Sequence, residues 1–340
     1  MLTDAVNTWL KQILKQPNLQ FRQLSGGANN LGIQVSAGQS SWFLKCFELS
    51  QAIAQKKQQN EFLFSQALSE AGIFTIPKPI AINTSLGVSL FEYIDGEKVT
   101  NANSEAVLKA ALFIQEINAC QLATPLTVAS ESPNSLDGFC DIVSERLTRF
   151  EAVQPDNESI AEQFSAMLKK IAQRHNKIRS SLPAHWHKTI ERNIVSPSDF
   201  GFHNVLKQNK ALYFIDFEYA GLDTPWKLFA DFFSQPAVPV DIKHASQFLS
   251  IKLFKDLKDN PCDTLKVYEL TLLKWCLIML NEFLPEVQKR RLFSWNISCI
   301  EEQKEKLKQV QFAQLHKCDA YFDKISIKVI GLNKVLRETA

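Results

Sequence analysis

The sequence has little net charge and no cluster that would favour an anionic polymer. Lys and Arg number 38 and Asp and Glu number 36, which gives a formal net charge of only +2. Such a chain lacks the global field that draws nucleic acid or an anionic membrane surface. The one basic cluster, Lys289 to Arg291, is interpreted as a solvated helix end beside core aromatics rather than an RNA-binding patch. We therefore expect neither a nucleic-acid partner nor a membrane partner.

Paired cysteines and a long apolar run are also missing, and we expect no leader segment. The seven cysteines are odd in number and widely spaced, and none forms a CxxC pair. This pattern predicts free thiols in a reducing compartment. Residues Met1 to Leu14 do not resemble a signal peptide, because they include Asp4 and Asn7 and no long apolar run. The most apolar stretch, Val267 to Leu284, is interrupted by charges and predicts a buried helix. A cytoplasmic enzyme is the expectation.

The sequence lacks the motifs of two hydrolase classes. No G-x-S-x-G is present, so the nucleophile elbow of a serine hydrolase is excluded. The histidines of His185-Trp186-His187 do not have H-E-x-x-H spacing and have no cysteine nearby. We interpret these histidines as surface or packing residues. Internal repeats and low-complexity segments are absent as well.

The pattern of apolar residues predicts an α+β protein with a β-rich N-lobe, residues 1–95, and a helical C-lobe, residues 96–340. The predicted elements of the N-lobe are a helix at Asp4 to Leu14, strands at Leu19 to Leu24, Leu31 to Ser36 and Ser41 to Phe47, a helix at Gln51 to Ala71, and a hairpin of Ile80 to Ile82 with Gly87 to Ile94. The first helices of the C-lobe are predicted at Ser104 to Cys120, Leu136 to Phe150 and Ser159 to Ser181.

Two blocks of sequence, Ser196 to Leu206 and Tyr213 to Gly221, carry the chemistry. The first reads D-x-x-x-x-N from Asp199 to Asn204, and the second is an apolar strand that ends in Asp216. Phosphoryl transfer needs one carboxylate to orient the attacking hydroxyl, and an amide and a second carboxylate to hold magnesium on the phosphates. Magnesium favours hard oxygen ligands, which Asn204 and Asp216 supply. Each residue alone could be an ordinary turn or cap residue. Their order and short separation favour a phosphoryl-transfer site.

These blocks resemble the catalytic and metal loops of the aminoglycoside phosphotransferase family, and Ile215 to Ala220 is especially similar to its choline/ethanolamine kinase relatives. The resemblance extends over roughly Leu19 to Phe233. It implies a bilobal, protein-kinase-like fold and a kinase that uses ATP and magnesium to phosphorylate an alcohol group of a small-molecule acceptor. By this resemblance Asp199 is the catalytic residue, and Asn204 and Asp216 are the metal ligands.

The resemblance also implies a nucleotide site upstream. Gly26, Gly27 and Asn30 lie between two predicted strands, where the family places its phosphate-covering loop. Lys45 stands alone in an apolar strand and needs a partner, since an unpaired buried charge is costly. The family's lysine at this point reaches the α and β phosphates, and Glu61 matches its acidic partner. Taken singly, the loop has a plain hairpin turn as its alternative, and Glu61 a solvated helix face.

Three further positions follow from the same resemblance. Glu92 and Ile94 match the hinge, whose backbone groups would bind adenine. Asp231 is similar to the acid that braces the family's catalytic loop, so its expected role is structural. Where the family commonly has histidine, two residues before the catalytic acid, this chain has Pro197. That difference concerns the bracing of the loop more than its chemistry.

A protein kinase would use the same catalytic residues as a small-molecule kinase. The span from Asp216 to Asp231 is too short for an activation loop with an A-P-E anchor, so a small acceptor is preferred to a protein substrate. Two alternatives stay open, a choline/ethanolamine kinase specifically and a non-catalytic, nucleotide-binding pseudokinase. Retention of the lysine and the acidic and amide residues argues against the pseudokinase. The acceptor classes that we expect are a sugar, an amino alcohol or an aminoglycoside.

Overall fold

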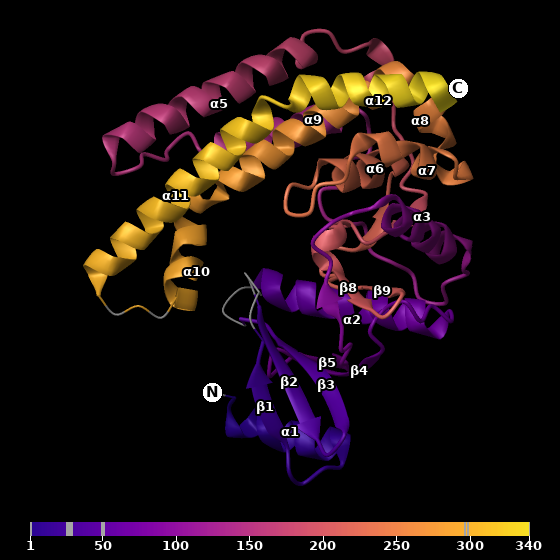
Figure 1. Cartoon of the computed structure of the whole chain (residues 1–340), viewed down its shortest axis with the longest axis vertical. Coiled ribbons are helices and arrows are strands. Elements are labelled where there is room, and N and C mark those ends of the chain that lie inside the picture. The colour runs from indigo at the N-terminus through magenta and orange to yellow at the C-terminus, as the bar shows by residue number, and fades with distance from the viewer. Residues whose placement is uncertain (1, 25–29, 49–51, 296, 298, 340) are drawn as a thin grey trace. The chain divides into compact units, whose positions relative to one another are not determined.

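Two stretches that lie far apart in the sequence build the first unit of the structure, a computed structural model that describes residues 2–24, 30–48, 52–295, 297 and 299–339 (Figure 1). This unit comprises Met1–Ser130 and Ile194–Asp223, and the second comprises Glu131–Asn193 and Thr224–Ala340. Both predicted chemistry blocks therefore fall largely in the unit that contains the N-terminal sheet. The lobe boundary at residues 95 and 96 is a different kind of division and stays a prediction.

An antiparallel sheet of five strands forms the N-terminal part of the first unit. Its order is β1-β2-β3-β5-β4. Helix α1 (Asp4–Leu14) contributes Val6 and Leu10 to a core cluster that also contains Val35, Leu44 and Leu90 from the sheet. The strands are β1 (Gln20–Gln23), β2 (Leu31–Ala37), β3 (Ser40–Cys46), β4 (Pro79–Asn83) and β5 (Val88–Glu92). Buried Ile33 and Val35 alternate with less buried residues along β2, as expected for a strand with one face against a core. In β3, Trp42, Phe43 and Leu44 form a continuous apolar run.

Helix α2 (Ala52–Glu70) and a set of short elements complete the first unit. The short strands form two further antiparallel sheets, of order β6-β8-β9 and β10-β7. These strands are β6 (Glu97–Lys98), β7 (Ile194–Ser196), β8 (Val205–Gln208), β9 (Ala211–Phe214) and β10 (Gly221–Asp223). The same unit contains α3 (Ser104–Ala119) and, in its described part, the 3-10 turn η2 (Phe202–Asn204).

Phenylalanine side chains anchor both chemistry blocks. Phe200 follows Asp199 directly and stacks on Phe113 of α3, which also stacks on Phe214 at the end of β9 with ring centroids 4.0 Å apart. Phe217, one residue after Asp216, packs on Phe64 of α2 at 5.1 Å. These rings are buried, and burial of such large apolar groups stabilises the positions of the neighbouring polar residues. The backbone at Asp199 and Asp216 is therefore held in place by the buried rings of the neighbouring Phe200 and Phe217.

The second unit is helical, and helix α9 lies at its centre (Figure 1). Helix α9 packs against α4, α5, α6, α8, α11 and α12. The α-helices are α4 (Gly138–Thr148), α5 (Glu158–Arg179), α6 (Pro225–Ser234), α7 (Ala245–Leu249), α8 (Lys255–Asp259), α9 (Pro261–Met279), α10 (Pro285–Trp295), α11 (Ile300–Phe322) and α12 (Ile325–Thr339). The 3-10 turns are η1 (Ala184–His187), η3 (Ile242–His244), η4 (Lys252–Phe254) and η5 (Leu280–Phe283).

The predicted secondary structure is confirmed. The N-terminal part has the expected sheet and long helix, and the C-terminal part is helical, as an α+β fold requires. Three predicted helices correspond to α3, α4 and α5, with ends that differ by at most two residues. The apolar stretch Val267 to Leu284 lies mostly in the buried helix α9, and all seven cysteines are free thiols. Among the described residues, no helix has both the length and the apolar character needed to cross a membrane.

A close approach of backbone at Gly221 predicts a specific loss of stability. A Cβ at this position would overlap the carbonyl oxygen of Thr127 and would lie 2.7 Å from the amide nitrogen of Ala129. Gly221→Ala should lower the free energy of unfolding by about 2–4 kcal/mol, because backbone must move apart. Gly38→Ala is the control. Its Cβ meets nothing within 4 Å, so only the left-handed backbone costs about 1 kcal/mol. Equal losses in chemical denaturation would contradict the steric argument.

Candidate active site

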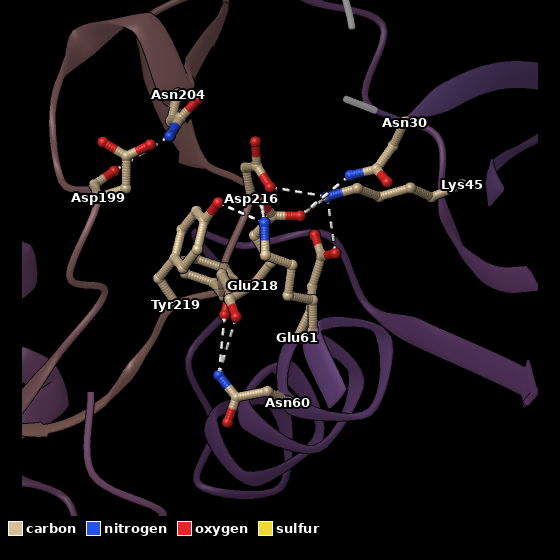
Figure 2. Close-up of polar contacts among 11 residues, drawn as sticks. Asn30, Lys45, Asn60, Glu61, Asp199, Asn204, Asp216, Glu218 and Tyr219 are labelled. Carbon is tan, nitrogen blue, oxygen red and sulfur yellow. Dashed lines mark hydrogen bonds and ion pairs between the residues drawn. The ribbon is translucent and has the colours of Figure 1, made fainter. Parts of the chain in front are cut away.

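Lys45 lies at the centre of a buried group of charges in the first unit. It belongs to β3 and is only 6% exposed. Its Nζ lies 2.7 Å from Glu61 Oε2 on α2 and 2.7 Å from Asp216 Oδ1 (Figure 2). The ammonium donates to both carboxylates. One lysine therefore joins the sheet, the helix and the second chemistry block, and the pair expected from the sequence is present.

Burial and pairing shift the ionisation of all three groups. Burial disfavours the charged ammonium of Lys45, but the carboxylates around it raise its pKa above the usual range. Burial likewise opposes ionisation of Asp216, yet Lys45 outweighs it and holds the pKa of that carboxyl below its ordinary value. Burial raises the pKa of Glu61 to about 7 against the attraction of Lys45. Lys45 therefore stays charged at neutral pH and binds both carboxylates at the same distance.

Asp216 stands in an unusual backbone conformation. Its φ is 68°, in the left-handed region that few non-glycine residues adopt, although Asp and Asn tolerate it better than most. The preceding residue, Ile215, donates its N–H to the carbonyl of Asn204 at 3.0 Å. The side chain of Asp216 is 39% exposed despite its bond to Lys45. The carboxylate is therefore fixed at one oxygen and accessible from solvent.

The loop before Asp199 is braced by serines. Ser198 has φ 65° and donates its N–H to Ser196 Oγ at 3.0 Å, while its own Oγ donates to the carbonyl of Ser130. Asp199 donates its N–H to the carbonyl of Pro197 at 3.0 Å. Pro197 itself is buried. The loop thus acquires its bracing from serine hydroxyls on either side of the proline.

Asp199 and Asn204 lie together, as the D-x-x-x-x-N spacing predicts. Asn204 Nδ2 donates to the backbone carbonyl of Asp199 at 3.0 Å (Figure 2). The carboxylate of Asp199 is about one-third exposed, and its Oδ1 lies 3.3 Å from His203 Nε2. The side chain is therefore oriented from one side and open on the other. A partly exposed carboxylate of this kind is able to accept a hydrogen bond from a bound hydroxyl group.

The donor atoms present fit a magnesium ion. Because the nitrogen of the Asn204 side chain is engaged, its Oδ1 is the atom left for a cation, and Asp216 offers an accessible carboxylate. Magnesium proteins commonly supply one or two oxygen ligands and leave the rest to water and substrate phosphates. In the part of the chain that the structure describes, no group of three or more His, Cys, Asp and Glu residues has metal-binding geometry. The site suits a cation brought with a phosphate.

The remaining predicted nucleotide residues have different outcomes. Asn30 donates from Nδ2 to Glu218 Oε2 at 3.0 Å, whereas Gly26 and Gly27 lie outside the described residues. Glu92 ends β5, and its N–H donates to the carbonyl of Lys78 at 2.8 Å. Ile94 is buried just beyond. The adenine-binding role of the last two residues concerns backbone groups and stays a prediction.

Sequence reasoning missed a second set of contacts to α2. Lys57 Nζ donates to Glu218 Oε1 at 3.1 Å and also to the hydroxyl of Tyr219. Asn60 Nδ2 donates to the carbonyl of Ala220 at 2.8 Å. The only signal in the sequence is the helical spacing of positions 57, 60 and 61, which places them on one face. That spacing does not name their partners, which are about 160 residues away. The His203 contact was detectable, because His203 follows Asp199 by four residues.

Asp231, in the second unit, has a structural environment. It is 4% exposed and accepts hydrogen bonds from Lys274 and, at 3.1 Å, from Trp275 Nε1. Lys227 lies 3.5 Å from its second oxygen. The two lysines outweigh the effect of burial and keep its pKa low. The contacts join α6 to α9, so this acid braces two helices of the second unit. The bracing of the catalytic loop that the resemblance implies stays a prediction.

The histidines that the sequence excluded as metal ligands are paired with acids. His185 Nε2 lies 2.7 Å from Asp263 Oδ2, and the fully buried Trp186 donates from Nε1 to Asp263 Oδ1 at 2.7 Å. His187 lies beside Asp137. These contacts explain the short turn η1 as a packing element, in agreement with the prediction.

A comparison with protein-family models shows the family to which this chain belongs. The model of the phosphotransferase enzyme family matches residues 20–236, well over half of the chain. The chain belongs to the phosphotransferase enzyme family, and the predicted enzyme class, transfer of a phosphoryl group to a hydroxyl acceptor, is confirmed at this level. The matched range contains every residue assigned to the site from the sequence. No curated protein sequence matches the chain.

Solved structures confirm the protein-kinase-like fold class. A choline/ethanolamine kinase family protein from Mesorhizobium loti has a TM-score of 0.58 at 15% identity, and the similarity covers 98% of this chain and 100% of that one. APH(2″)-IIa in complex with gentamicin has a TM-score of 0.55 at 16% identity, covering 93% and 98%. Spectinomycin phosphotransferase APH(9)-Ia, in complex with ADP and spectinomycin, has a TM-score of 0.55 at 15% identity, covering 90% and 98%.

The buried acid of the second unit yields a stability prediction. Asp231→Ala would leave Lys274 and Lys227 buried beside an apolar side chain, and should lower the free energy of unfolding by about 3–5 kcal/mol. The matched control is Asp319→Ala, whose pair with Lys170 is about half exposed and should be worth only about 0–1 kcal/mol. Urea denaturation of both variants measures the difference. If Asp231→Ala unfolds like its control, the acid does not brace the helices.

Proposed function

We propose that this protein is an ATP-dependent small-molecule kinase that transfers the γ-phosphate to an alcohol group of a small acceptor. One observation carries the proposal. Lys45 is bonded at once to Glu61 and Asp216, and Asp216 adjoins the loop that presents Asp199 and Asn204. Phosphoryl transfer needs a cation for phosphate, oxygen ligands for magnesium and a carboxylate for the attacking hydroxyl. Described residues of one unit supply all three.

The relatives support the chemical class of the substrates. Spectinomycin phosphotransferase is similar in fold and was solved with ADP and spectinomycin, and APH(2″)-IIa was solved with gentamicin. By analogy, ATP is the proposed phosphate donor, and the acceptor is a sugar, an amino alcohol or an aminoglycoside. The similarity to a choline/ethanolamine kinase family protein keeps an amino alcohol among these classes.

In the proposed mechanism, Lys45 binds phosphate oxygens of the nucleotide. Glu61 holds the ammonium in place from α2, so that the lysine keeps its orientation when Asp216 exchanges its partner. Asn30 is tethered to Glu218 and lies at the end of the segment proposed to cover the phosphates. The backbone at Glu92 and Ile94 would receive the adenine. These groups bind and orient the donor and take no part in bond breaking.

Asn204 and Asp216 would hold the magnesium ion. When bound, the ion neutralises charge on the phosphate oxygens and thereby makes the terminal phosphorus easier to attack. For this, Asp216 has to relax its bond to Lys45, and its exposed carboxylate allows that exchange. Asn204 is held by Asp199 through its nitrogen, which keeps its oxygen directed away from that bond.

Asp199 would orient the acceptor. Its carboxylate accepts a hydrogen bond from the acceptor hydroxyl and takes the proton as the oxygen bonds to the γ-phosphorus, while the bond between that phosphorus and the bridging oxygen of ADP breaks. Transition states of this type are loose, so orientation contributes more than basicity. His203 fixes the carboxylate at Oδ1 and leaves the other oxygen for the acceptor.

A panel of acceptors tests the proposal directly. Sugars, amino alcohols and aminoglycosides are each incubated with ATP and magnesium, ADP release is followed, and the phosphorylated acceptor is identified by mass spectrometry. We expect turnover with at least one class and its loss when magnesium is chelated. Nucleotide binding without phosphorylation of any acceptor would instead favour a pseudokinase, and would refute the proposed function.

The role of Asp199 predicts a separation of binding from turnover. Asp199→Ala should reduce kcat by about 10²- to 10⁴-fold, the usual cost of removing a positioned base. ATP affinity should be nearly unchanged, because the proposed nucleotide contacts come from other residues. Asp199→Asn preserves a hydrogen-bond acceptor and should lose less. Steady-state kinetics and calorimetry with ADP measure both quantities, and a parallel loss of affinity would contradict the assignment.

A further inference from the structure

One face of α2 is bound to the segment that carries the proposed metal ligand. Glu61 pairs with Lys45, and Asn60, one residue earlier, donates to the carbonyl of Ala220. Asn60 Oδ1 also accepts a hydrogen bond from Thr127 Oγ1 at 2.9 Å. Figure 2 shows Asn60 and Glu61 rising from the helix towards Glu218 and Asp216. The helix thus fixes both the backbone and the charges of this segment.

Lys57, one turn before Glu61, is the part of this face that no step of the mechanism uses. Its Nζ donates to Glu218 Oε1 at 3.1 Å and to the Tyr219 hydroxyl, and it lies 4.3 Å from the centre of the Tyr219 ring. The Lys57 side chain is 18% exposed and that of Glu218 only 4%. A carboxylate buried to this degree needs a cation. Lys57 supplies it.

The two oxygens of Glu218 face two different lysines. Oε1 is bonded to Lys57, whereas Oε2 accepts from Asn30 and lies 3.9 Å from Lys45 Nζ. Three carboxylates (Glu61, Asp216 and Glu218) therefore share two ammonium groups (Lys45 and Lys57). Without Lys57, Glu218 would depend on Lys45, which already bonds the other two acids. Because Lys57 pairs with Glu218, Lys45 can bind Glu61 and Asp216.

We propose that Lys57 is a positioning residue of the phosphoryl-transfer site, which neutralises Glu218 and so sets the balance between nucleotide binding and cation binding. The inference rests on the proposed function. Removal of Lys57 makes the group one charge more negative and draws Lys45 towards Glu218. Phosphate should then bind less tightly, and a divalent cation more tightly. Loosening of the fold would weaken both, so the opposite signs distinguish charge balance from a merely structural role.

The test compares Lys57→Met with Lys57→Arg in the full chain. Binding of ADP alone and of Mn²⁺ alone is measured, by calorimetry and by electron paramagnetic resonance respectively, and thermal unfolding verifies that each variant is folded. For Lys57→Met we expect about tenfold weaker ADP binding and about three- to tenfold tighter Mn²⁺ binding, as a unit charge at this range implies. Lys57→Arg keeps the charge and should remain close to the unmodified protein in both.

Two further variants sharpen the comparison. Lys56→Met removes the same charge from the exposed side of the same helix, and should change neither affinity appreciably. Glu218→Gln combined with Lys57→Met restores the net charge of the group. In the Glu218→Gln background, Lys57→Met should therefore weaken ADP binding much less than it does in the unmodified protein. This double-variant cycle also distinguishes the pair from the rest of the helix face.

The possible outcomes separate the two proposals. If Lys57→Met weakens ADP and Mn²⁺ together, or leaves both unchanged, the charge role of Lys57 is refuted while the kinase proposal stands on its acceptor panel. The charge role is refuted as well if Lys57→Met fails to fold and Lys57→Arg, which keeps the charge, changes the ADP or Mn²⁺ affinity by the amounts expected for Lys57→Met. If the unmodified protein binds neither ADP nor Mn²⁺, the proposed function fails, and the role of Lys57 fails with it.

Discussion

The ammonium group of Lys45 is the constraint on which the arrangement of the site depends. A charge buried in an apolar strand must be paired, and here its partners come from a helix and from a segment 171 residues further along the chain. The sheet, α2 and the segment after β9 must therefore meet at one point. Because Glu61 and Asp216 share the same ammonium group, a change in the contact of Lys45 with one of them alters its interaction with the other. A site that binds a charged substrate requires such coupling.

Aromatic packing fixes the backbone positions of the acids in and beside this charged group. Phe200 and Phe217 are each adjacent to an acid of the proposed site, and both are buried against helices of the same unit. Their side chains fix the backbone, and the backbone in turn presents Asp199 and Asp216 outward. Apolar burial thus provides the position, and ion pairing selects the orientation. Asp199 and Asp216 can therefore be partly exposed while their neighbours Phe200 and Phe217 are buried.

Much of this was predictable from the sequence, for local reasons. Alternating and helical periodicities predicted the sheet strands and α2 to α5, because each depends on residues close in the chain. The separation of Asp199 and Asn204 by five positions is short enough for one loop to bring them together. Lys45 could be inferred to need a partner from its apolar neighbours alone. The choice of Glu61 as that partner came from resemblance.

The contacts that sequence reasoning missed are those between distant segments. Nothing near Lys57 or Asn60 indicates that they bond to Glu218 and Ala220, because a helix face specifies direction without specifying what lies opposite. The partners of Asp231 were missed for the same reason, since Lys274 and Trp275 lie more than forty positions away. Such pairs become visible only when the topology has brought the segments together.

The left-handed backbone of Asp216 has an evolutionary consequence. At φ 68° the residues accepted without added strain are few, with Asn, Asp and Gly foremost. Asn and Gly are both among the residues that a single base change in an aspartate codon can give, and both keep the conformation and discard the carboxylate. If Asp216 holds the metal ion as proposed, either change would remove that ligand while the backbone kept its conformation. A lineage could pass in this way from enzyme to binding protein by one substitution, with the same backbone throughout.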